Sequence, residues 1–193
     1  MTRTFVALLI PDAWIAYLRD VARALQAKSS GFSWVKPENV HLTVRFLGDL
    51  DDSGVARARE SVRRSAAGLS APVSRLGRLG AFPRMDRPRV LWVGLSQGEK
   101  EVEAVAAQVN VGLERDGFGP LDKPFRAHLT VARARDRVVA PHETAASLEL
   151  GELLGQPPPA SPLGRLAVMK SELHPSGARY NVLEELRLPE PAP

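Results

Sequence analysis

The sequence of 193 residues contains no cysteine. Disulfide bonds, thiolate nucleophiles and zinc–thiolate sites are therefore excluded, and a reducing cytoplasm is the natural location. No segment approaches the roughly 20 apolar residues that a membrane helix needs. The apolar stretch from Phe5 to Ile10 is closed by Pro11 and is too short for a signal peptide. We expect a soluble cytoplasmic protein that makes no contact with a membrane.

Several signatures of common catalytic sites are missing as well. The chain has no phosphate-binding Gly-x-x-x-x-Gly-Lys-Ser/Thr loop, no His-Glu-x-x-His metal motif and no nucleophile-elbow sequence. Histidines and carboxylates do not cluster at the spacing of metal ligands. The net charge is +4, most of the positive charge comes from arginine, and the planar guanidinium suits phosphate. An anionic ligand is modestly favoured, although charge alone does not identify it.

What the sequence does contain is the tetrapeptide His-Leu-Thr-Val twice, starting at His41 and at His128, in a chain with only four histidines. Side chains of a strand alternate between its faces, so His41 would share a face with Thr43 and His128 with Thr130. Each repeat would offer an imidazole and a hydroxyl about 6–7 Å apart. Two such strands facing each other across a groove would bring two acid–base groups and two hydroxyl donors together.

Chance and structural roles compete with this interpretation, since a strand histidine is more often structural than catalytic. The chemistry that two histidines allow is nevertheless specific. Because the imidazole pKa is near ~6.5, one ring can be neutral while the other is protonated. One ring could then accept a proton from a nucleophile while the other protonates a leaving oxygen at a phosphodiester. The two threonine hydroxyls could donate to the phosphate oxygens.

Hydrophobic periodicity and turn residues predict strands and helices in alternation. The order suggests two similar α+β halves with a boundary around residues 69–73, and the last strand pair could cross back into the first half. Residues 82–88 are rich in turn-forming residues and separate two strands. The expected helices cover about 12–28, 51–67, 99–114 and 141–155, and the expected strands cover 4–10, 32–35, 41–48, 73–79, 90–95, the segment after His128, 163–173 and 179–188.

Longer segments around these motifs resemble a known family in order along the chain. They are Arg3–Leu8, Trp34–Gly48, Phe82-Pro83 with Pro88–Gly94, Pro124–Arg133, and the closing hairpin segments Ser171–Leu173 and Gly177–Tyr180. Together they resemble the 2H phosphoesterase superfamily, which is named for paired His-x-Thr-x motifs. Within it the chain is most similar to the bacterial and archaeal RNA 2′,3′-cyclic phosphodiesterases, once called 2′-5′ RNA ligases.

This resemblance implies an α+β fold with two lobes related by a pseudo-twofold axis, in which antiparallel sheets flank a central groove and helices lie outside. We expect residues 1–188 to form this single bilobal domain and residues 189–193 to form a disordered tail. The implied reaction is hydrolysis of RNA 2′,3′-cyclic phosphate ends to 2′-phosphate without a metal or other cofactor. The implied partners are such RNA ends or cyclic nucleotides, and we expect a monomer.

The resemblance also implies roles for the residues of both repeats. His41 is the implied general acid and His128 the implied general base, although the near-identity of the repeats leaves the reverse order open. Thr43 and Thr130 would hold the phosphate.

Three further residues are candidates for substrate binding. Phe46 and Arg133 stand at the same offset after their histidines, but strict alternation turns them away from the groove unless a bulge intervenes. The competing roles are a core residue for Phe46 and an ion pair for Arg133. Arg126 lies on the predicted face of His128 and could meet phosphate. Arg45 shares the His41 face, where it could simply be solvated.

The remaining histidines and the tryptophans have no assigned role in binding or catalysis. We expect His142 and His174 at the surface. Trp14, Trp34 and Trp92 stand among apolar residues, which favours the core over a base-stacking role.

Other functions remain compatible with the sequence. The same histidines could catalyse RNA 2′-5′ ligation, the reverse transesterification, or cleave 2′-5′ linked oligonucleotides. A binding module for RNA ends without turnover is a further alternative, but it would not need two titrating rings.

Overall fold

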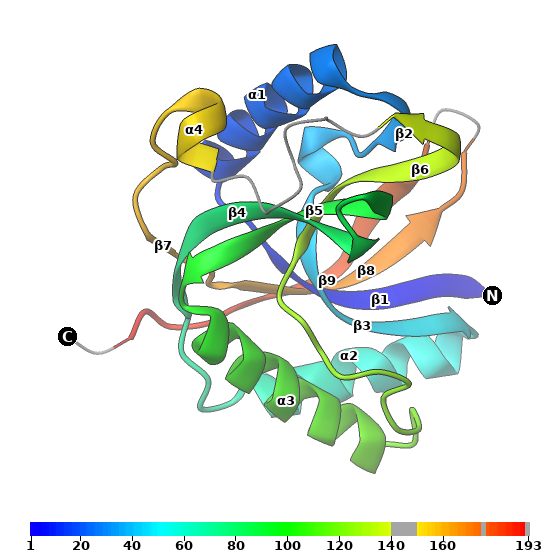
Figure 1. Ribbon diagram of the computed structural model, residues 1–193. Helices are drawn as coiled ribbons and strands as arrows, with labels where there is room; N and C mark the ends of the chain where they lie inside the picture. The colour runs from blue at the N-terminus through cyan, green and yellow to red at the C-terminus, as the bar shows by residue number, and fades with distance from the viewer. Residues whose placement is uncertain (140–149, 175–176, 192–193) are drawn as a thin grey trace.

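The computed structural model describes residues 1–139, 150–174 and 177–191. Its strands form one antiparallel sheet in the order β7-β4-β5-β6-β3-β1-β8-β9, and β2 pairs with β6 (Figure 1). The strands are β1 (Thr2–Leu9), β2 (Ser30–Trp34), β3 (His41–Leu50), β4 (Val73–Arg84), β5 (Arg87–Gln97), β6 (Leu129–Val139), β7 (Ser161–Pro162), β8 (Arg165–Glu172) and β9 (Arg179–Arg187). The helices are α1 (Asp12–Lys28), the 3-10 turn η1 (Pro37–Asn39), α2 (Asp52–Ala66), α3 (Glu99–Arg115) and α4 (Leu150–Leu154).

The sheet divides into two lobes. The first lobe contains β1, β3, β8 and β9, and α2 and α3 cover it; the second contains β2, β4, β5 and β6 beside α1 and α4 (Figure 1). The chain exchanges elements between the lobes, because α1 follows β1 yet lies with the second lobe, and β8 and β9 return to the first. The predicted bilobal α+β fold, with antiparallel sheets inside and helices outside, is confirmed.

A single bridge between Leu42 of β3 and Leu129 of β6 joins the lobes at the centre of the sheet, within the described residues. The pairing is antiparallel, so the two tetrapeptides run in opposite directions past each other. In this register His41 lies across from Thr130, and Thr43 across from His128. The bridge therefore stands where a twofold axis would pass, and it brings together the two repeats that lie far apart in the sequence.

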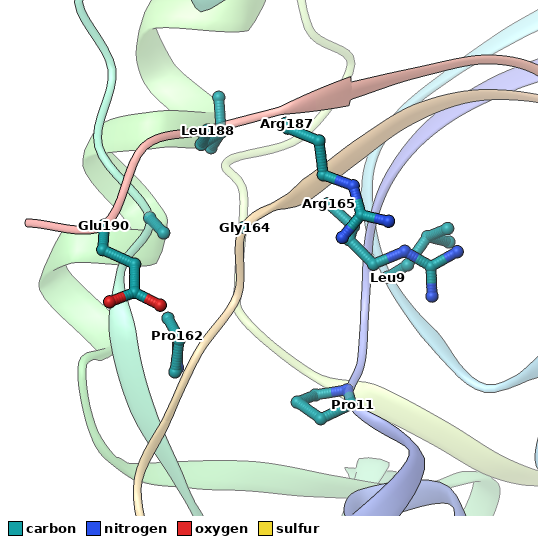
Figure 2. Close-up of a pocket in the computed structure, with 9 residues that line it drawn as sticks. Leu9, Pro11, Pro162, Gly164, Arg165, Arg187, Leu188 and Glu190 are labelled. Carbon is teal, nitrogen blue, oxygen red and sulfur yellow. The ribbon is translucent and has the colours of Figure 1, made fainter.

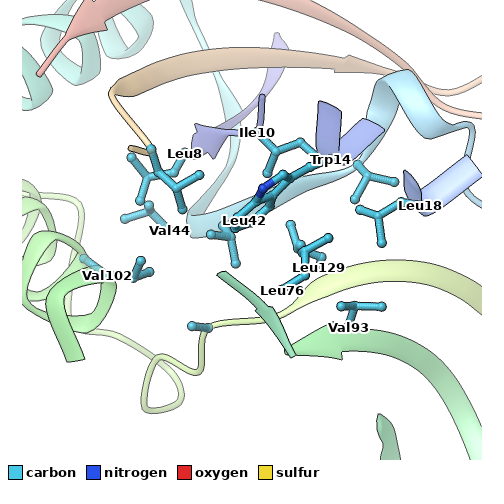
Figure 3. Packing of buried hydrophobic residues seen from close by; sticks show 14 of the residues in the cluster. Leu8, Ile10, Trp14, Leu18, Leu42, Val44, Leu76, Val93, Val102 and Leu129 are labelled. Atoms are coloured by element: carbon cyan, nitrogen blue, oxygen red, sulfur yellow. The ribbon is translucent and has the colours of Figure 1, made fainter. Parts of the chain in front are cut away.

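The alternate residues of both repeats are buried in the main core (Figure 3). Leu42 and Leu129 are fully buried between the sheet and the helices, with Trp14 of α1 on one side and Val102 of α3 near Val44 on the other. Trp14 is thus a core residue, as expected, and partly buried Trp34 packs against the same core. Packing of these apolar positions holds the histidine-bearing face of the sheet outward.

Some element boundaries differ from the sequence prediction. Residues 82–88 are not a long turn: β4 extends to Arg84, β5 starts at Arg87, and only Met85 and Asp86 connect them. Strand β3 does not end at Gly48, which adopts φ +76° and still pairs with Thr4. The predicted helix 141–155 lies largely outside the described residues, and its described part is α4. No helix in the described part of the chain is long and apolar enough to span a bilayer.

Arg45 connects β3 to the loop that precedes the second histidine. It is 6% exposed, and its guanidinium donates to the carbonyl oxygens of residues 118–120 at 2.5–3.3 Å and to Asn110 Oδ1 at 3.4 Å. It also lies 3.7 Å from a carboxylate oxygen of Glu114. The expectation that Arg45 shares the His41 face is wrong. Its side chain instead fixes the segment from α3 toward β6, which carries His128.

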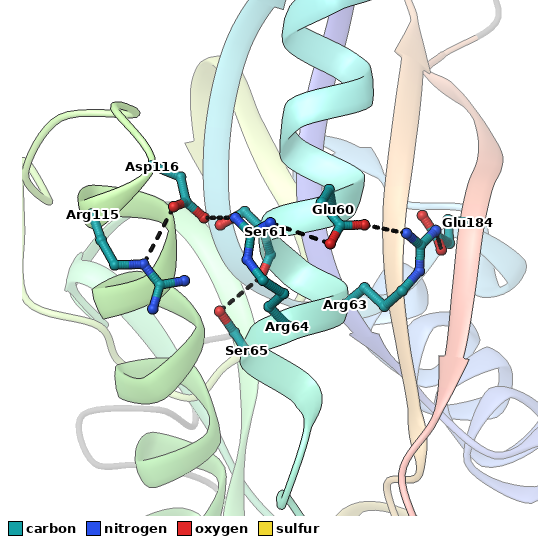
Figure 4. Close-up of polar contacts among 8 residues, drawn as sticks. All are labelled: Glu60, Ser61, Arg63, Arg64, Ser65, Arg115, Asp116 and Glu184. Atoms are coloured by element: carbon teal, nitrogen blue, oxygen red, sulfur yellow. Dashed lines mark hydrogen bonds and ion pairs between the residues drawn. The ribbon is translucent and has the colours of Figure 1, made fainter.

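Ion pairs attach α2 to its neighbours on the outside of the first lobe (Figure 4). Arg64 of α2 contacts Asp116, after α3, at 2.7 Å, and Arg63 contacts Glu184 of β9. Arg59 reaches the same glutamate at 3.0 Å. Exposed pairs of this kind are each worth only ~0–1 kcal/mol, so they orient α2 more than they stabilise it.

We expect Arg45→Met to lower the free energy of unfolding by about 3 kcal/mol, because several buried acceptors lose a charged donor. Urea denaturation would measure this change. Arg19→Met, at an exposed position of α1, is the matched control and should change stability by less than about 0.5 kcal/mol. Equal stability of the two variants would contradict the anchoring role of Arg45.

Candidate active site

A β-bulge follows the motif threonine in each histidine strand. The extra residue is Val44 in β3 and Val131 in β6, at the same offset from each histidine. A bulge places two residues opposite one and shifts the alternation of side chains. Residues 41–46 and 128–133 consequently share one burial pattern, in which two consecutive buried residues precede an exposed one. The exposed residues are Phe46 and Arg133, which the bulges turn toward the histidine face.

Both histidines are oriented by the same backbone hydrogen bond. Nδ1 of His41 lies 2.7 Å from the carbonyl oxygen of Asn39, and Nδ1 of His128 lies 2.7 Å from that of Arg126. A carbonyl oxygen only accepts, so Nδ1 carries the proton in each neutral ring and Nε2 is left with a lone pair. Thr43 Oγ1 lies 3.0 Å from Nε2 of His41. Each ring therefore presents Nε2 as its proton-transferring atom.

Aromatic side chains surround His41. Phe5 stacks on the imidazole with ring centroids 4.9 Å apart, and Tyr180 meets it edge-on at 5.3 Å. Phe46 in turn stacks on Phe5, with the two ring centroids 5.7 Å apart. Neither Phe5 nor Tyr180 was predicted from the sequence as a neighbour of the site. Phe5, Ala7 and Leu9 alternate along β1 and share one face, but their contact with Tyr180 of β9 could be inferred only once the strand order was known.

The second histidine has an aromatic environment of its own. His128 meets Phe82 edge-on at 5.2 Å and Trp92 at 6.4 Å. Trp92 was expected in the core, but it lies half-buried beside the catalytic candidate. Its ring fits there because Gly80 leaves the space free: a Cβ at that position would stand 2.4 Å from the indole.

Burial and positive charge both lower the pKa of each histidine. For His41, burial lowers the pKa most, the hydrogen bond to Asn39 raises it, and the charges of Arg133 and His128 lower it further. For His128, burial again dominates, the hydrogen bond to the Arg126 carbonyl raises the pKa, and Arg133 lowers it. Arg133 thus acts on both rings, and His128 also acts on His41. The structure brings the two predicted histidines together with Arg133.

The other two binding candidates differ in what they contribute. Phe46 is 53% exposed and has the Arg3 guanidinium 5.3 Å above its ring, so its side chain is open to a ligand. Arg126 is exposed, and its carbonyl, rather than its side chain, contacts His128. His174 is also exposed, whereas His142 lies outside the described residues. Among the residues described, no three His, Asp or Glu side chains gather as metal ligands would.

The arrangement offers two proton-transferring nitrogens, the hydroxyls of Thr43 and Thr130, and one guanidinium near both rings. Such a set can move protons to and from a bound phosphoryl group while hydroxyl and guanidinium donors stabilise its oxygens.

Comparisons with known proteins identify the family of the chain. The family model for LigT-like phosphoesterases matches residues 8–92. The RNA 2′,3′-cyclic phosphodiesterase of Archaeoglobus fulgidus is 36% identical over 136 residues, covering 69% of this chain and 73% of the relative. That of Thermus thermophilus is 30% identical over 192 residues, covering 96% and 90%. The crystal structure of TT0787 of T. thermophilus matches with a TM-score of 0.73 and 27% identity, covering 97% and 98%. The chain belongs to the LigT-like phosphoesterase family.

Proposed function

We propose that this phosphoesterase hydrolyses RNA 2′,3′-cyclic phosphate ends to 2′-phosphate ends by acid–base catalysis between His41 and His128, without a metal. The observation that carries the proposal is the matched pair of imidazoles, each with Nδ1 bound to a backbone carbonyl, which leaves Nε2 as the nitrogen that can exchange a proton with the substrate. The names of the relatives support the substrate.

In the proposed reaction Nε2 of His128 takes a proton from water, whose oxygen attacks phosphorus. The bond from phosphorus to the 3′ oxygen breaks, and protonated His41 delivers its Nε2 proton to that oxygen. The product carries a 2′-phosphate, and the next cycle requires His41 to regain the proton that His128 has gained. Opening the strained five-membered ring reduces the need for a metal. Negative charge on the bound phosphate would raise the pKa of His41 and so favour its acidic form.

Thr43, Thr130 and Arg133 would hold the phosphate oxygens, and Arg126 would add a cation at the rim. Phe46 would contact the terminal nucleoside through its exposed ring. Since the two histidines belong to different lobes, residues 1–188 would have to act as one domain.

We expect the purified protein to convert an RNA oligomer ending in a 2′,3′-cyclic phosphate to the 2′-phosphate in the presence of EDTA. His41→Ala and His128→Ala should each reduce kcat by about 10²–10⁴-fold, since each removes one proton-transfer partner. Chromatographic separation of 2′- from 3′-phosphate products measures the outcome. His174→Ala is the matched control and should retain activity. Dependence on an added divalent metal would refute the mechanism, and joining of RNA ends without hydrolysis would favour ligation.

A substrate with sulfur in place of the 3′ oxygen tests the order of the two histidines. A thiolate leaves without prior protonation, so loss of the general acid should matter less. We expect this substrate to restore most of the activity of His41→Ala and little of that of His128→Ala. Single-turnover rates measure the effect. Restoration of His128→Ala instead would exchange the two roles.

We expect a bell-shaped dependence of kcat/KM on pH with an optimum below about 6.5, because burial and Arg133 lower the pKa of both histidines. Arg133→Gln removes a positive charge that disfavours both imidazolium forms. Both pKa values should therefore rise, and the optimum should move to higher pH. Arg126→Gln keeps the carbonyl that binds His128 and should shift the optimum less. An unchanged optimum in Arg133→Gln would contradict the electrostatic role of Arg133.

A further inference from the structure

A pocket of about 230 Å³ lies at the edge of the first lobe, where β1, β8 and β9 meet the segments that lead to the second lobe (Figure 2). Figure 2 shows Arg165 and Arg187 on one side and Glu190 and Pro162 on the other. The remaining wall is largely apolar and includes Leu9 at the end of β1. None of the functions assigned above uses this pocket.

The pocket opens on the same face of the sheet as the first histidine. Leu9 pairs with His41 on one side and with Arg165 on the other, and Arg165 pairs with Arg187. Directly paired residues point to the same face, so these four side chains form one row across four strands. Adjacent strands lie about 4.8 Å apart, which places Arg165 roughly 10 Å from His41 at the backbone. An extended arginine side chain and one nucleotide together span this separation.

Glu185 holds the two arginines side by side. It accepts two hydrogen bonds from Arg165, at 3.0 and 2.8 Å, and its Oε1 lies 3.1 Å from Nε of Arg187. Glu185 thus orients both guanidinium groups, and these three side chains together carry one net positive charge. The other acidic groups nearby are Glu190, which lines the pocket, and Asp12, which acts electrostatically on Arg165. The Arg187 side chain is 77% exposed, so its terminal nitrogens remain accessible to a ligand.

We propose that Arg165 and Arg187 bind the RNA phosphodiester nearest to the cyclic phosphate end, which makes this pocket a second anion subsite of the enzyme. This inference rests on the proposed function, because the reacting phosphate must lie at His41. Guanidinium groups prefer phosphate and can donate two parallel hydrogen bonds to it. Glu190 and Pro162 line the opposite wall, so a phosphate would lie on the arginine side, away from the Glu190 carboxylate. A nucleoside 2′,3′-cyclic phosphate without an upstream linkage would leave the subsite empty.

The decisive probe is an RNA trinucleotide that ends in a 2′-phosphate, prepared with either a normal or a methylphosphonate group at its last internucleotide linkage. The methylphosphonate removes the charge of that linkage while retaining its shape. We expect calorimetry to show about tenfold weaker binding of the neutral trinucleotide to the wild-type protein, because a charge-assisted contact is lost. The double variant Arg165→Gln, Arg187→Gln should bind both trinucleotides with nearly equal affinity.

Two comparisons complete the test. Arg19→Gln, which removes an exposed arginine of α1, should discriminate between the trinucleotides as the wild type does. The double variant should hydrolyse a nucleoside 2′,3′-cyclic phosphate as fast as the wild type does. Equal binding of both trinucleotides by the wild type, or unchanged discrimination by the double variant, would overturn the subsite. Absence of hydrolysis by every protein would instead refute the proposed function, while the binding data would still decide the subsite.

Discussion

The extra residue after each motif threonine is the constraint on which the arrangement of the site depends. With Val44 and Val131 inserted, the alternation of each strand shifts by one, and two consecutive residues point to the core. On the N-terminal side of the extra residue, each strand presents its histidine and threonine to the site. On the C-terminal side, β3 presents Phe46 and β6 presents Arg133. Without the shift, Arg45 would leave its buried acceptors and Arg133 would move away from both rings. One backbone irregularity therefore serves the core and the site together.

The aromatic surroundings of the two imidazoles have an electrostatic consequence. Phe5, Tyr180, Phe82 and Trp92 exclude water from the rings, which disfavours the charged form of each histidine. Arg133 adds to this effect on both rings. The free site is thereby biased toward neutral imidazoles, whereas an anion placed between the rings and Arg133 would counteract the bias. Binding of a phosphate group and protonation of a histidine are consequently coupled, and each should favour the other.

The sequence was sufficient for those features that follow from local pattern. Alternation placed His41 and Thr43 on one face, and helical periodicity located α1 and α3 closely. The misassigned position of Arg45 shows the limit. A bulge depends on how two strands pair, and no residue of β3 by itself predicts the shift in side-chain alternation. The aromatic neighbours of the histidines could not be predicted for the same reason, since Tyr180 reaches His41 only through the order β3-β1-β8-β9. The row from His41 to Arg187 likewise exists only after four strands are assembled.

The two lobes repeat the backbone of the site more faithfully than its side chains. Thr43 pairs with Ala7, whereas Thr130 pairs with Trp92, so equivalent positions differ greatly in size. An RNA end has no twofold symmetry: the chain continues on one side of the cyclic phosphate only. Equivalent acid–base groups near the axis can serve both proton transfers, but contacts farther out must distinguish the two sides. Differences between the lobes should therefore determine how the substrate is oriented, and the arginine pair of β8 and β9 lies at such a position.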